Sequence, residues 1–527
     1  MVLERSVHAA ADRRDPDLAS WNPGLSSPDM EILPEWETLT ARTREQVRNN
    51  GVASGAVQTA IDRVIGTGLR LVCKPDYKAL GLSREWAEEW SRHVEARWRL
   101  YANDIDNYCD ASRRLDFAGL LAQAYRSYML SSSEILATIE WLPRRPDKYA
   151  TAIQMIQPDR LSNPWDIADT DRLRRGVELA EYGVAQAYHI RQAHPSEVGL
   201  MGSRNAYSWQ RVPAFTPWGR RRVIHVFEQE QPGQTRGKPG FVSVLAEMRV
   251  LSRFKRAALE AAIANAMYAA VIESEMPTED VAAALGGSTS PMKDYLKAKN
   301  AFNQENGYAT LNGLRVPHLV PGEKFRLLAA EHPTASYAEF EAASLRHLAA
   351  GFNMSYEEVS RDYSKTNMSA ARVAMNQAWR FFAGRRHHIA NKYATQIYAA
   401  WLEEAFDRAD VEMPAGAPGF IEAKTAWCGC EWIGAPKGHV DELKERQAGG
   451  LAYGMYTTSL KRLCAEQGDD WEEVLEQRAY ELKRMRELEL DPAQPLEVGR
   501  RAASSGPKID PDDGGAGAPN EALGGAA

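Results

Sequence analysis

The sequence predicts an α+β fold that is mainly helical, with long helices and small β-rich regions. Residues 241–273 contain neither Gly nor Pro, and their apolar and Ala side chains recur at helical spacing. A continuous helix of this length would span roughly 50 Å, at about 1.5 Å per residue. A second long helix is predicted over 368–406, where four apolar residues follow one another at i, i+4 spacing: Ile389, Tyr393, Ile397 and Trp401. Between 150 and 230, short β-branched segments alternate with turn residues and predict strands.

The other elements follow from the same periodicities. Residues 34–141 are expected to be mainly helical, with one helical pattern ending at Gly66 and Gly68 and the strand LRLVCKP after it. The stretch DFAGLLAQAYRSYMLSSSEILATIEWLP predicts a helix and then a strand. Residues 308–329 predict short strands, and DDWEEVLEQRAYELKRMRELEL predicts a charged helix near the end.

Composition shifts divide the chain into seven expected parts. Both ends are polar or rich in Gly, Ala and Pro, which is typical of disordered segments. The parts are a disordered arm (1–30), a mixed helical and β part (31–150), a β-rich segment (151–235), a long helix with a short β segment (236–330), a polar loop with a long helix (331–410), a helical C-terminal region (411–495) and a disordered tail (496–527).

The overall composition is that of a soluble globular protein. The chain has 527 residues, of which 44% are hydrophobic and 26% are charged. It contains neither an apolar run long enough to span a membrane nor a standard secretion signal. Its formal net charge of −7 argues against a surface that binds nucleic acid tightly, because such surfaces are usually basic.

Neither a catalytic residue, a metal ion nor a cofactor is expected. Nucleophile-elbow and zinc-protease motifs are both missing from the sequence. Of the five cysteines, only Cys428 and Cys430 lie close together; His439 is nearby, but no second close pair of ligands exists. We therefore expect free thiols in a reducing compartment.

The stretch GQTRGKPG has the outward look of a phosphate-binding loop. Three residues separate Gly233 from Gly237 where four are needed, and Lys238 is followed by Pro239 instead of Ser or Thr. Proline has neither a hydroxyl for magnesium nor an N–H for a phosphate. We instead expect a turn that starts the long helix, with Pro239 near the first helical position.

A basic cluster lies within the second long helix and comprises Arg380, Arg385, Arg386 and Lys392. These side chains could contact phosphates, or they could pair with acidic residues of a neighbouring subunit. The chain around them is acidic, so contacts between subunits are at least as well supported. Long helices, polar loops and no catalytic constellation are together typical of an assembly protein.

Several motifs resemble the lambda-like family of tailed-phage portal proteins. The similar segments include SWNPGLSSPD, ARTREQVRNNGVASGAVQTAIDRVIGTGLRL, IQPDRLSNP and AYHI, as well as the Arg-Gly-x-Pro turn before the long helix. A later segment is similar through Tyr356, Glu357, Asp362, Asn367, Ser369 and Arg372. In AWCGCEWIGAPKG, Gly438 stands where the family usually has Glu, and Cys428 and Cys430 are local to this chain. The resemblance covers about residues 20–490.

The resemblance implies a ring of twelve subunits at one vertex of a capsid, around a channel through which double-stranded DNA is packaged and later ejected. Implied partners are further copies of the chain, the terminase large subunit, a head–tail adaptor and the major capsid protein. The implied location is the virion, after assembly in the bacterial cytoplasm. In family terms, 31–150 is a wing part, 151–235 wing or clip, 236–330 stem and wing, 331–410 channel loop and helix, and 411–495 a crown-like region.

The polar loop from Ser360 to Asn367 is the segment expected to meet DNA, because portal relatives carry their channel loop at this position. The candidate channel residues are Arg361, Tyr363, Ser364, Lys365, Thr366 and Asn367. A conduit must contact DNA without holding it, since each neutralised phosphate adds affinity that opposes sliding. An ordinary surface loop between subunits is the alternative.

Two other classes of protein stay open at this stage. A packaging ATPase or nuclease would need a phosphate loop or a cluster of carboxylates for two metal ions, and the sequence has neither. Another capsid structural protein is the second alternative, which the two long helices do not favour. The sequence does not distinguish a virion from a prophage or a gene-transfer particle as the source.

Overall fold

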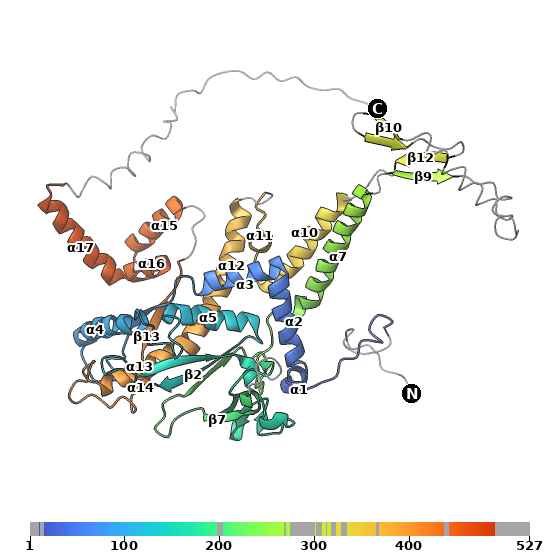
Figure 1. The fold of residues 1–527 in the computed structure, drawn as a ribbon. Helices are drawn as coiled ribbons and strands as arrows, with labels where there is room; N and C mark the ends of the chain where they lie inside the picture. The colour runs from blue at the N-terminus through green and yellow to red at the C-terminus, as the bar shows by residue number, and fades with distance from the viewer. Residues whose placement is uncertain are drawn as a thin grey trace, which may run out of the picture. The chain divides into compact units, whose positions relative to one another are not determined.

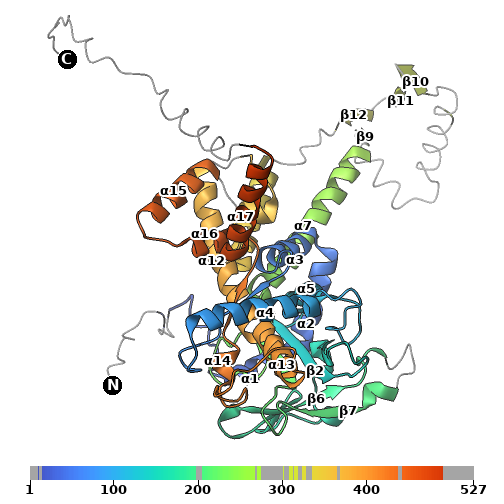
Figure 2. The same ribbon diagram turned by 90° about the vertical axis from the view of Figure 1, so that its left-hand side faces the viewer.

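The structure is a computed structural model that describes residues 10, 15–197, 204–267, 270–274, 301, 308–311, 314–317, 323–327, 335–364, 368–436 and 442–490. It divides into two compact units, Met1–Ala435 and Pro436–Ala527 (Figures 1 and 2). Long helices and small antiparallel sheets make up the first unit, so the predicted mainly helical α+β class is confirmed.

The helices of the first unit account for most of its regular structure. They are α1 (Pro28–Ile32), α2 (Trp36–Asn49), α3 (Gly51–Val64), α4 (Arg84–Ala102), α5 (Phe117–Leu130), α7 (Val242–Met267), α10 (Ala335–Phe352), α11 (Tyr356–Ser360), α12 (Met368–Ile389), α13 (Thr395–Asp407) and α14 (Lys424–Trp427). The sequence suggested one helical pattern through α2 and α3, but the chain is extended at Asn50. The Asn50 side chain accepts from the Val52 N–H and caps α3.

Two antiparallel sheets lie beside these helices. The first has the order β3-β2-β8, formed by β2 (Glu134–Trp141), β3 (Thr151–Ile156) and β8 (Val223–Phe227). The second has the order β4-β5-β6-β7, formed by β4 (Leu173–Arg174), β5 (Val177–Leu179), β6 (Ala185–Arg191) and β7 (Trp209–Pro213). These strands confirm the predicted β-rich region.

Three strand pairs complete the β structure within the described ranges. Strand β1 (Arg70–Cys73) pairs with β13 (Cys430–Ile433), which places Cys73 opposite Cys430. The other two pairs are β9 (Ala270–Ser274) with β12 (Glu323–Leu327), and β10 (Tyr308–Leu311) with β11 (Leu314–Pro317).

Aromatic side chains fill the main core around α13. Trp98 of α4 meets Trp401 edge-on, with ring centroids 5.2 Å apart, and meets Tyr398 in the same way at 5.7 Å. The predicted i, i+4 stripe of Ile389, Tyr393, Ile397 and Trp401 is almost completely buried. The long helix over 368–406 is confirmed as α12 and α13, joined by one π-helical turn at Ala390–Ala394.

Two expectations need correction. The helix predicted over 241–273 ends at Met267, and Ala270–Glu273 belong to strand β9, which has β12 as its partner. The expected disordered arm is too long, since Pro28–Ile32 form α1. Pro239 lies three residues before Val242, the first residue of α7, and so close to the start of the helix. Residues 1–9, 11–14 and 491–527 lie outside the described residues.

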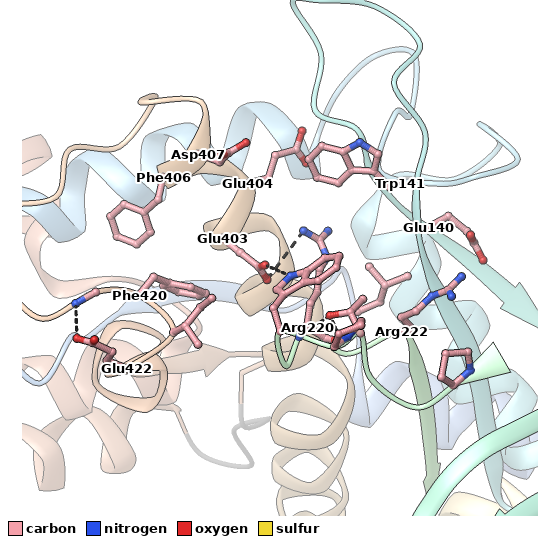
Figure 3. A pocket seen from close by; sticks show the side chains of 17 residues that line it. Glu140, Trp141, Arg220, Arg222, Glu403, Glu404, Phe406, Asp407, Phe420 and Glu422 are labelled. Atoms are coloured by element: carbon pink, nitrogen blue, oxygen red, sulfur yellow. Dashed lines mark hydrogen bonds and ion pairs between the residues drawn. The ribbon is translucent and has the colours of Figure 1, made fainter.

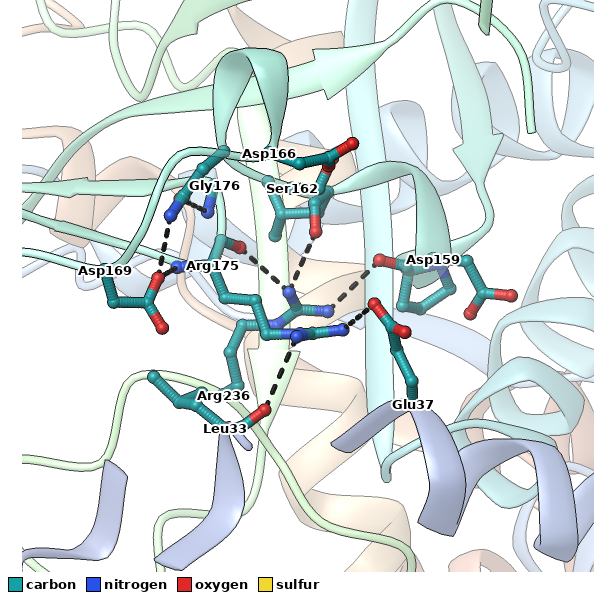
Figure 4. A network of polar contacts seen from close by, with 12 residues as sticks. Leu33, Glu37, Asp159, Ser162, Asp166, Asp169, Arg175, Gly176 and Arg236 are labelled. Atoms are coloured by element: carbon teal, nitrogen blue, oxygen red, sulfur yellow. Dashed lines mark hydrogen bonds and ion pairs between the residues drawn. The ribbon is translucent and has the colours of Figure 1, made fainter. Parts of the chain in front are cut away.

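A buried arginine, Arg236, lies six residues before α7. Its five N–H donors all have acceptors: both oxygens of the Glu134 carboxylate at 2.8 Å, the carbonyls of Leu161 and Arg175 at 3.0 Å, and the carbonyl of Pro158 at 3.1 Å. The guanidinium also lies over the Trp36 ring, 4.4 Å from its centroid. Figure 4 shows it beside Arg175, whose own side chain donates to Glu37. One side chain therefore connects the start of α7 to α2, to β2 and to the second sheet.

The next residue has to be glycine. The Gly237 N–H donates to the Glu134 carboxylate at 2.6 Å, and a Cβ at this position would lie 2.2 Å from the Ser132 carbonyl oxygen. The Arg-Gly-x-Pro turn is thus a packing motif: the Arg fills a polar cavity, and the Gly lets two backbone segments approach.

The charge of Glu134 depends on this pairing. Burial alone would raise the pKa of its carboxyl group, but the attraction of Arg236 and the nearby imidazole of His225, 3.6 Å away, outweigh burial and hold that pKa well below its ordinary value of 4.5. Because the pKa is depressed in the folded state, the resulting stability is present at pH values above 4.5 and is lost as the pH falls below it.

The C-terminal unit consists, in its described part, of α15 (Glu442–Gly454), α16 (Leu460–Gln467) and α17 (Trp471–Glu487). Ser459 and Asp470 cap α16 and α17, and Gly468 ends α16 in the left-handed conformation. Helix α17 confirms the charged helix predicted near the end of the chain.

We predict that Arg236→Met destabilises the first unit by about 3–5 kcal/mol, because it leaves the Glu134 carboxylate buried without its partner. Denaturant unfolding at neutral pH measures this loss. The double variant Arg236→Met/Glu134→Leu is the control and should recover a large part of it. The difference between wild type and Arg236→Met should narrow as the pH falls below about 4. An unchanged unfolding midpoint in the single variant would contradict the assigned role.

Candidate functional site

The candidate channel segment, residues 360–367, begins at the end of helix α11. This helix has caps at both ends. The Ser355 hydroxyl accepts from the Glu358 N–H, and the Glu358 carboxylate accepts from the Ser355 N–H, both at 3.2 Å. Glu358 also forms an ion pair with Arg63 of α3 at 3.3 Å. At the other end, Arg361 adopts the left-handed conformation, with φ of 56°. Its N–H donates to the Glu357 carbonyl at 2.8 Å.

A short polar turn follows α11. The Asp362 carboxylate accepts from the Ser364 N–H at 3.0 Å and from the Ser364 hydroxyl at 2.6 Å. Arg361, Tyr363 and Ser364 are all exposed to solvent, and Tyr363 keeps 63% of its surface accessible. The other predicted channel residues, Lys365, Thr366 and Asn367, lie outside the described residues. The described part of the segment is therefore polar, exposed and held mainly by local hydrogen bonds.

Helix α12 follows the segment and is fixed to the rest of the first unit by two arginines. Arg385 donates to the Tyr128 hydroxyl at 3.2 Å and forms an ion pair with Glu228. Arg386 donates to the backbone carbonyls of Val64 at 2.9 Å and Arg63 at 2.8 Å. Burial lowers the pKa of Arg386 to about 10.

These contacts give two residues of the predicted basic cluster partners within their own subunit. The hydrogen bonds and ion pair of Arg385 and Arg386 are sufficient to explain why basic side chains stand at these two positions. Arg380 and Lys392 are exposed on the same helical run, and they remain candidates for contacts with a neighbouring subunit. Sequence reasoning missed the intramolecular partners because Glu228 and Arg63 are far away along the chain.

The stretch GQTRGKPG, which has the outward look of a phosphate-binding loop, makes contacts within its own subunit instead. Arg236 and Gly237 are buried in the Glu134 cluster, and Lys238 forms an ion pair with Glu230 at 2.6 Å. Among the described residues, no group of three His, Cys, Asp or Glu side chains is placed to hold a metal ion. Within the same ranges, none of the helices is sufficiently long and apolar to span a membrane.

Comparison with known proteins identifies the family. The family described as "Phage portal protein, lambda family" matches residues 14–386. The chain belongs to the lambda family of phage portal proteins. It is 36% identical to the portal protein of Escherichia phage N15 over 481 residues, which cover 90% of this chain and 89% of the relative. Identity to portal protein B of Escherichia phage lambda is 34% over 502 residues, covering 94% of this chain and 93% of that one.

Chains from solved structures of gene transfer agent (GTA) particles also match this chain. One chain, from the virion of the native particle, has a TM-score of 0.43 and 12% identity, and the match covers 72% of this chain and 84% of that one. Another comes from the neck of the native particle computed with C12 symmetry, with a TM-score of 0.41 and 12% identity, covering 69% of this chain and 86% of that one.

Membership in the portal family decides the main functional question. Portal proteins are structural components of the virion at its portal vertex, and they act in DNA packaging without being enzymes. The family implies a ring-shaped oligomer at the capsid vertex. The packaging-enzyme alternative is therefore set aside.

We predict that Ser355→Ala destabilises α11 by about 1 kcal/mol, because the N-terminal end of the helix loses its side-chain cap. Hydrogen exchange measures the effect locally: the amides of residues 356–361 should exchange several-fold faster, while those of α13 stay unchanged. Ser243→Ala, at an exposed position near the start of α7, is the matched control. Equal exchange in both variants would show that the cap does not order the segment.

Proposed function

We propose that twelve subunits close into a ring whose channel guides double-stranded DNA into the capsid and out of it. The proposed partners are the terminase large subunit on the packaging side, the head–tail adaptor once the head is full, and the major capsid protein around the ring. The family supports these partners by analogy, and features of α7 and of the channel segment support the ring and the channel.

Helix α7 exposes apolar side chains on opposite sides. Val250 and Leu259 are nine residues apart, which at 3.6 residues per turn places them about 180° apart around the helix axis. Both are more than 60% exposed, and Ile263 lies half exposed near the Leu259 side. In a head-to-tail ring, each subunit has one neighbour on either side. A helix with two exposed apolar sides suits a position between two neighbours, and this observation carries the proposed ring.

Helices α7 and α10 form a rigid pair that can support such contacts. Phe254 of α7 stacks on Tyr337 of α10, with ring centroids 5.7 Å apart, and Lys255 pairs with Glu341 at 2.5 Å. At the base of the pair the backbones come close, because a Cβ on Gly351 would lie 2.3 Å from a methyl group of Val244. The two helices can therefore act as one structural unit of the channel wall.

The channel segment is proposed to face the DNA. Arg361, Tyr363 and Ser364, followed in sequence by Lys365, Thr366 and Asn367, would form a circle of polar side chains repeated in every subunit. Each exposed cation makes only a screened contact with a phosphate, and the net charge of −7 per subunit limits any further attraction. Such a circle guides DNA and lets it slide. Arg380 and Lys392 are proposed to contact neighbouring subunits.

The ring is tested by electron microscopy and mass measurement of the purified protein. We expect closed rings of predominantly twelve subunits for the wild type. Leu259→Glu/Ile263→Glu should shift the population to monomers, because charges would be buried at the interface. Ile105→Glu, a charge placed on an exposed apolar side chain of a loop, is the control and should leave rings intact. A wild type that is monomeric under all conditions would overturn the proposed ring.

The channel segment is tested with Lys365→Glu. We expect normal rings but a smaller amount of DNA packaged or retained per particle, because a circle of carboxylates repels the phosphate backbone. Lys365→Arg keeps the charge and serves as the matched variant, with packaging close to wild type. Failure of ring assembly combined with normal packaging per assembled ring would place the segment at the subunit interface instead.

A further inference from the structure

Two cysteines, Cys73 and Cys430, lie directly opposite each other in the sheet formed by β1 and β13. All five cysteines of the chain are free thiols in the structure. Cys73 is buried and Cys430 is half-buried, so one thiol of the pair is partly accessible to a small reagent. Nothing in the proposed ring or channel uses these two side chains.

The hydrogen bonds around the two cysteines define which kind of cross-strand pair they form. The Lys74 N–H donates to the Gly429 carbonyl at 2.8 Å, so the adjacent pair of residues is a hydrogen-bonded pair. The Cys73 N–H instead points away from β13 and donates to the Glu95 carboxylate at 2.7 Å. Because the two kinds of pair alternate along an antiparallel ladder, Cys73 and Cys430 form a non-hydrogen-bonded pair. The Cα atoms of such a pair are about 4.5 Å apart, within the range of about 4.4–6.8 Å that a disulfide requires.

Both thiols point to the same side of the sheet, toward α13. The Cys73 Sγ lies 3.1 Å from the Tyr398 hydroxyl oxygen, and the Cys430 Sγ lies 3.6 Å from the Thr395 hydroxyl oxygen. Thr395 and Tyr398 are three residues apart and are therefore neighbours on one face of the helix. A bond between the two sulfur atoms thus requires rotation of two side chains, with little movement of the strands.

The thiol pair is separate from a cleft of about 1120 Å³ in the first unit. That cleft borders the last part of α13, where Glu403, Glu404 and Asp407 are among its lining residues, and neither cysteine lines it (Figure 3). Among the described residues, no group of three metal-binding side chains includes the pair. The pair is therefore suited to a reaction between its own two sulfur atoms.

Burial makes the pair slow to oxidise. It raises the pKa of the Cys73 thiol well above the ordinary value of 9.0, and it also raises the pKa of the Cys430 thiol. Because the thiolate is the attacking form, both thiols react slowly with small disulfides at neutral pH. A disulfide between them would have one buried and one half-buried sulfur, which slows its reduction as well.

We propose that Cys73 and Cys430 are a latent disulfide site, which a low-molecular-weight disulfide oxidises after the protein leaves a reducing compartment. The Cys430 thiolate attacks one sulfur of the small disulfide and releases one small thiol. The Cys73 thiolate then attacks the Sγ of Cys430 and releases the second small thiol. In sum, the two cysteines lose two protons and two electrons, and the small disulfide takes them up as it becomes two thiols.

The bond fixes the strand pair near the end of the first unit. Strand β13 ends at Ile433, close to Ala435, where this unit ends, and β1 is its partner in a two-stranded sheet. Trp432 of β13 packs against Trp98 and Phe117, with ring centroids 5.9 and 5.7 Å apart. Portal proteins are virion components, and a virion that has left the cell meets surroundings in which disulfides persist.

Non-reducing peptide mapping tests the site. The purified protein is incubated with oxidised glutathione, its remaining thiols are alkylated, and it is digested with trypsin. We expect peptide 71–78 to be linked to peptide 425–437 in most chains, and the link to disappear after reduction. Because the second peptide holds two cysteines, Cys428→Ala is the matched variant and should form the same link, whereas Cys430→Ser should form none. A bond between Cys428 and Cys430, or chains that carry only glutathione adducts, would overturn the proposal and leave Cys73 as a packing residue.

A second measurement determines whether the bond stabilises the fold. The oxidised wild type should unfold at a higher denaturant concentration than the same protein in excess dithiothreitol, because a bond between residues 73 and 430 restricts the unfolded chain. In Cys430→Ser the two unfolding midpoints should coincide. Equal midpoints in a wild type whose link is present by mapping would contradict the stabilising role. Both measurements concern a bond within one subunit, so their outcome is independent of whether the proposed ring forms.

Discussion

One buried guanidinium group holds together parts of this subunit that are distant in sequence. Arg236 can be buried only when five acceptors are in place at once, and they come from strand β2 and from two separate backbone segments of the β-rich region. An unpaired charge at this depth would be strongly unfavourable, so the arrangement is all-or-none. Arg236 lies six residues before α7, so the same contacts hold the chain close to the point where this long helix begins.

The rest of the first unit combines closely packed helices with an exposed polar segment that few contacts hold in place. Aromatic packing around α13 and the close α7–α10 pair give rigid elements. The described part of the channel segment, in contrast, is kept in shape by two caps and a local turn, each worth little by itself. For the proposed conduit this division is suitable: rigid helices would keep their shape, while an exposed polar segment would make contacts that break easily.

The sequence predicted the helices with strong periodicity and the location of the β-rich region, because burial periodicity is a local property. The stripe from Ile389 to Trp401 is an example, and it is buried as expected. The motif around Arg236 was identified as a helix-start turn, but its partner Glu134 could not be found, since a strand residue about a hundred positions away leaves no local signal. For the same reason, the contacts of Arg385 and Arg386 within their own chain left no signal in the sequence.

The π-helical turn at Ala390–Ala394 determines how far α12 is rotated relative to α13 about the helix axis. In a regular α-helix, residues four apart advance by about 40° per step, so a stripe at strict i, i+4 spacing would gradually turn away from the core. A π-turn holds more residues per turn, and it brings Ile397 and Trp401 back beneath Ile389 and Tyr393. The π-turn therefore rotates α12 relative to α13. This rotation also determines the side of the helix on which the polar segment before α12 lies. The rotation of α12 is therefore set inside the aromatic core around α13, and not at the exposed polar segment itself.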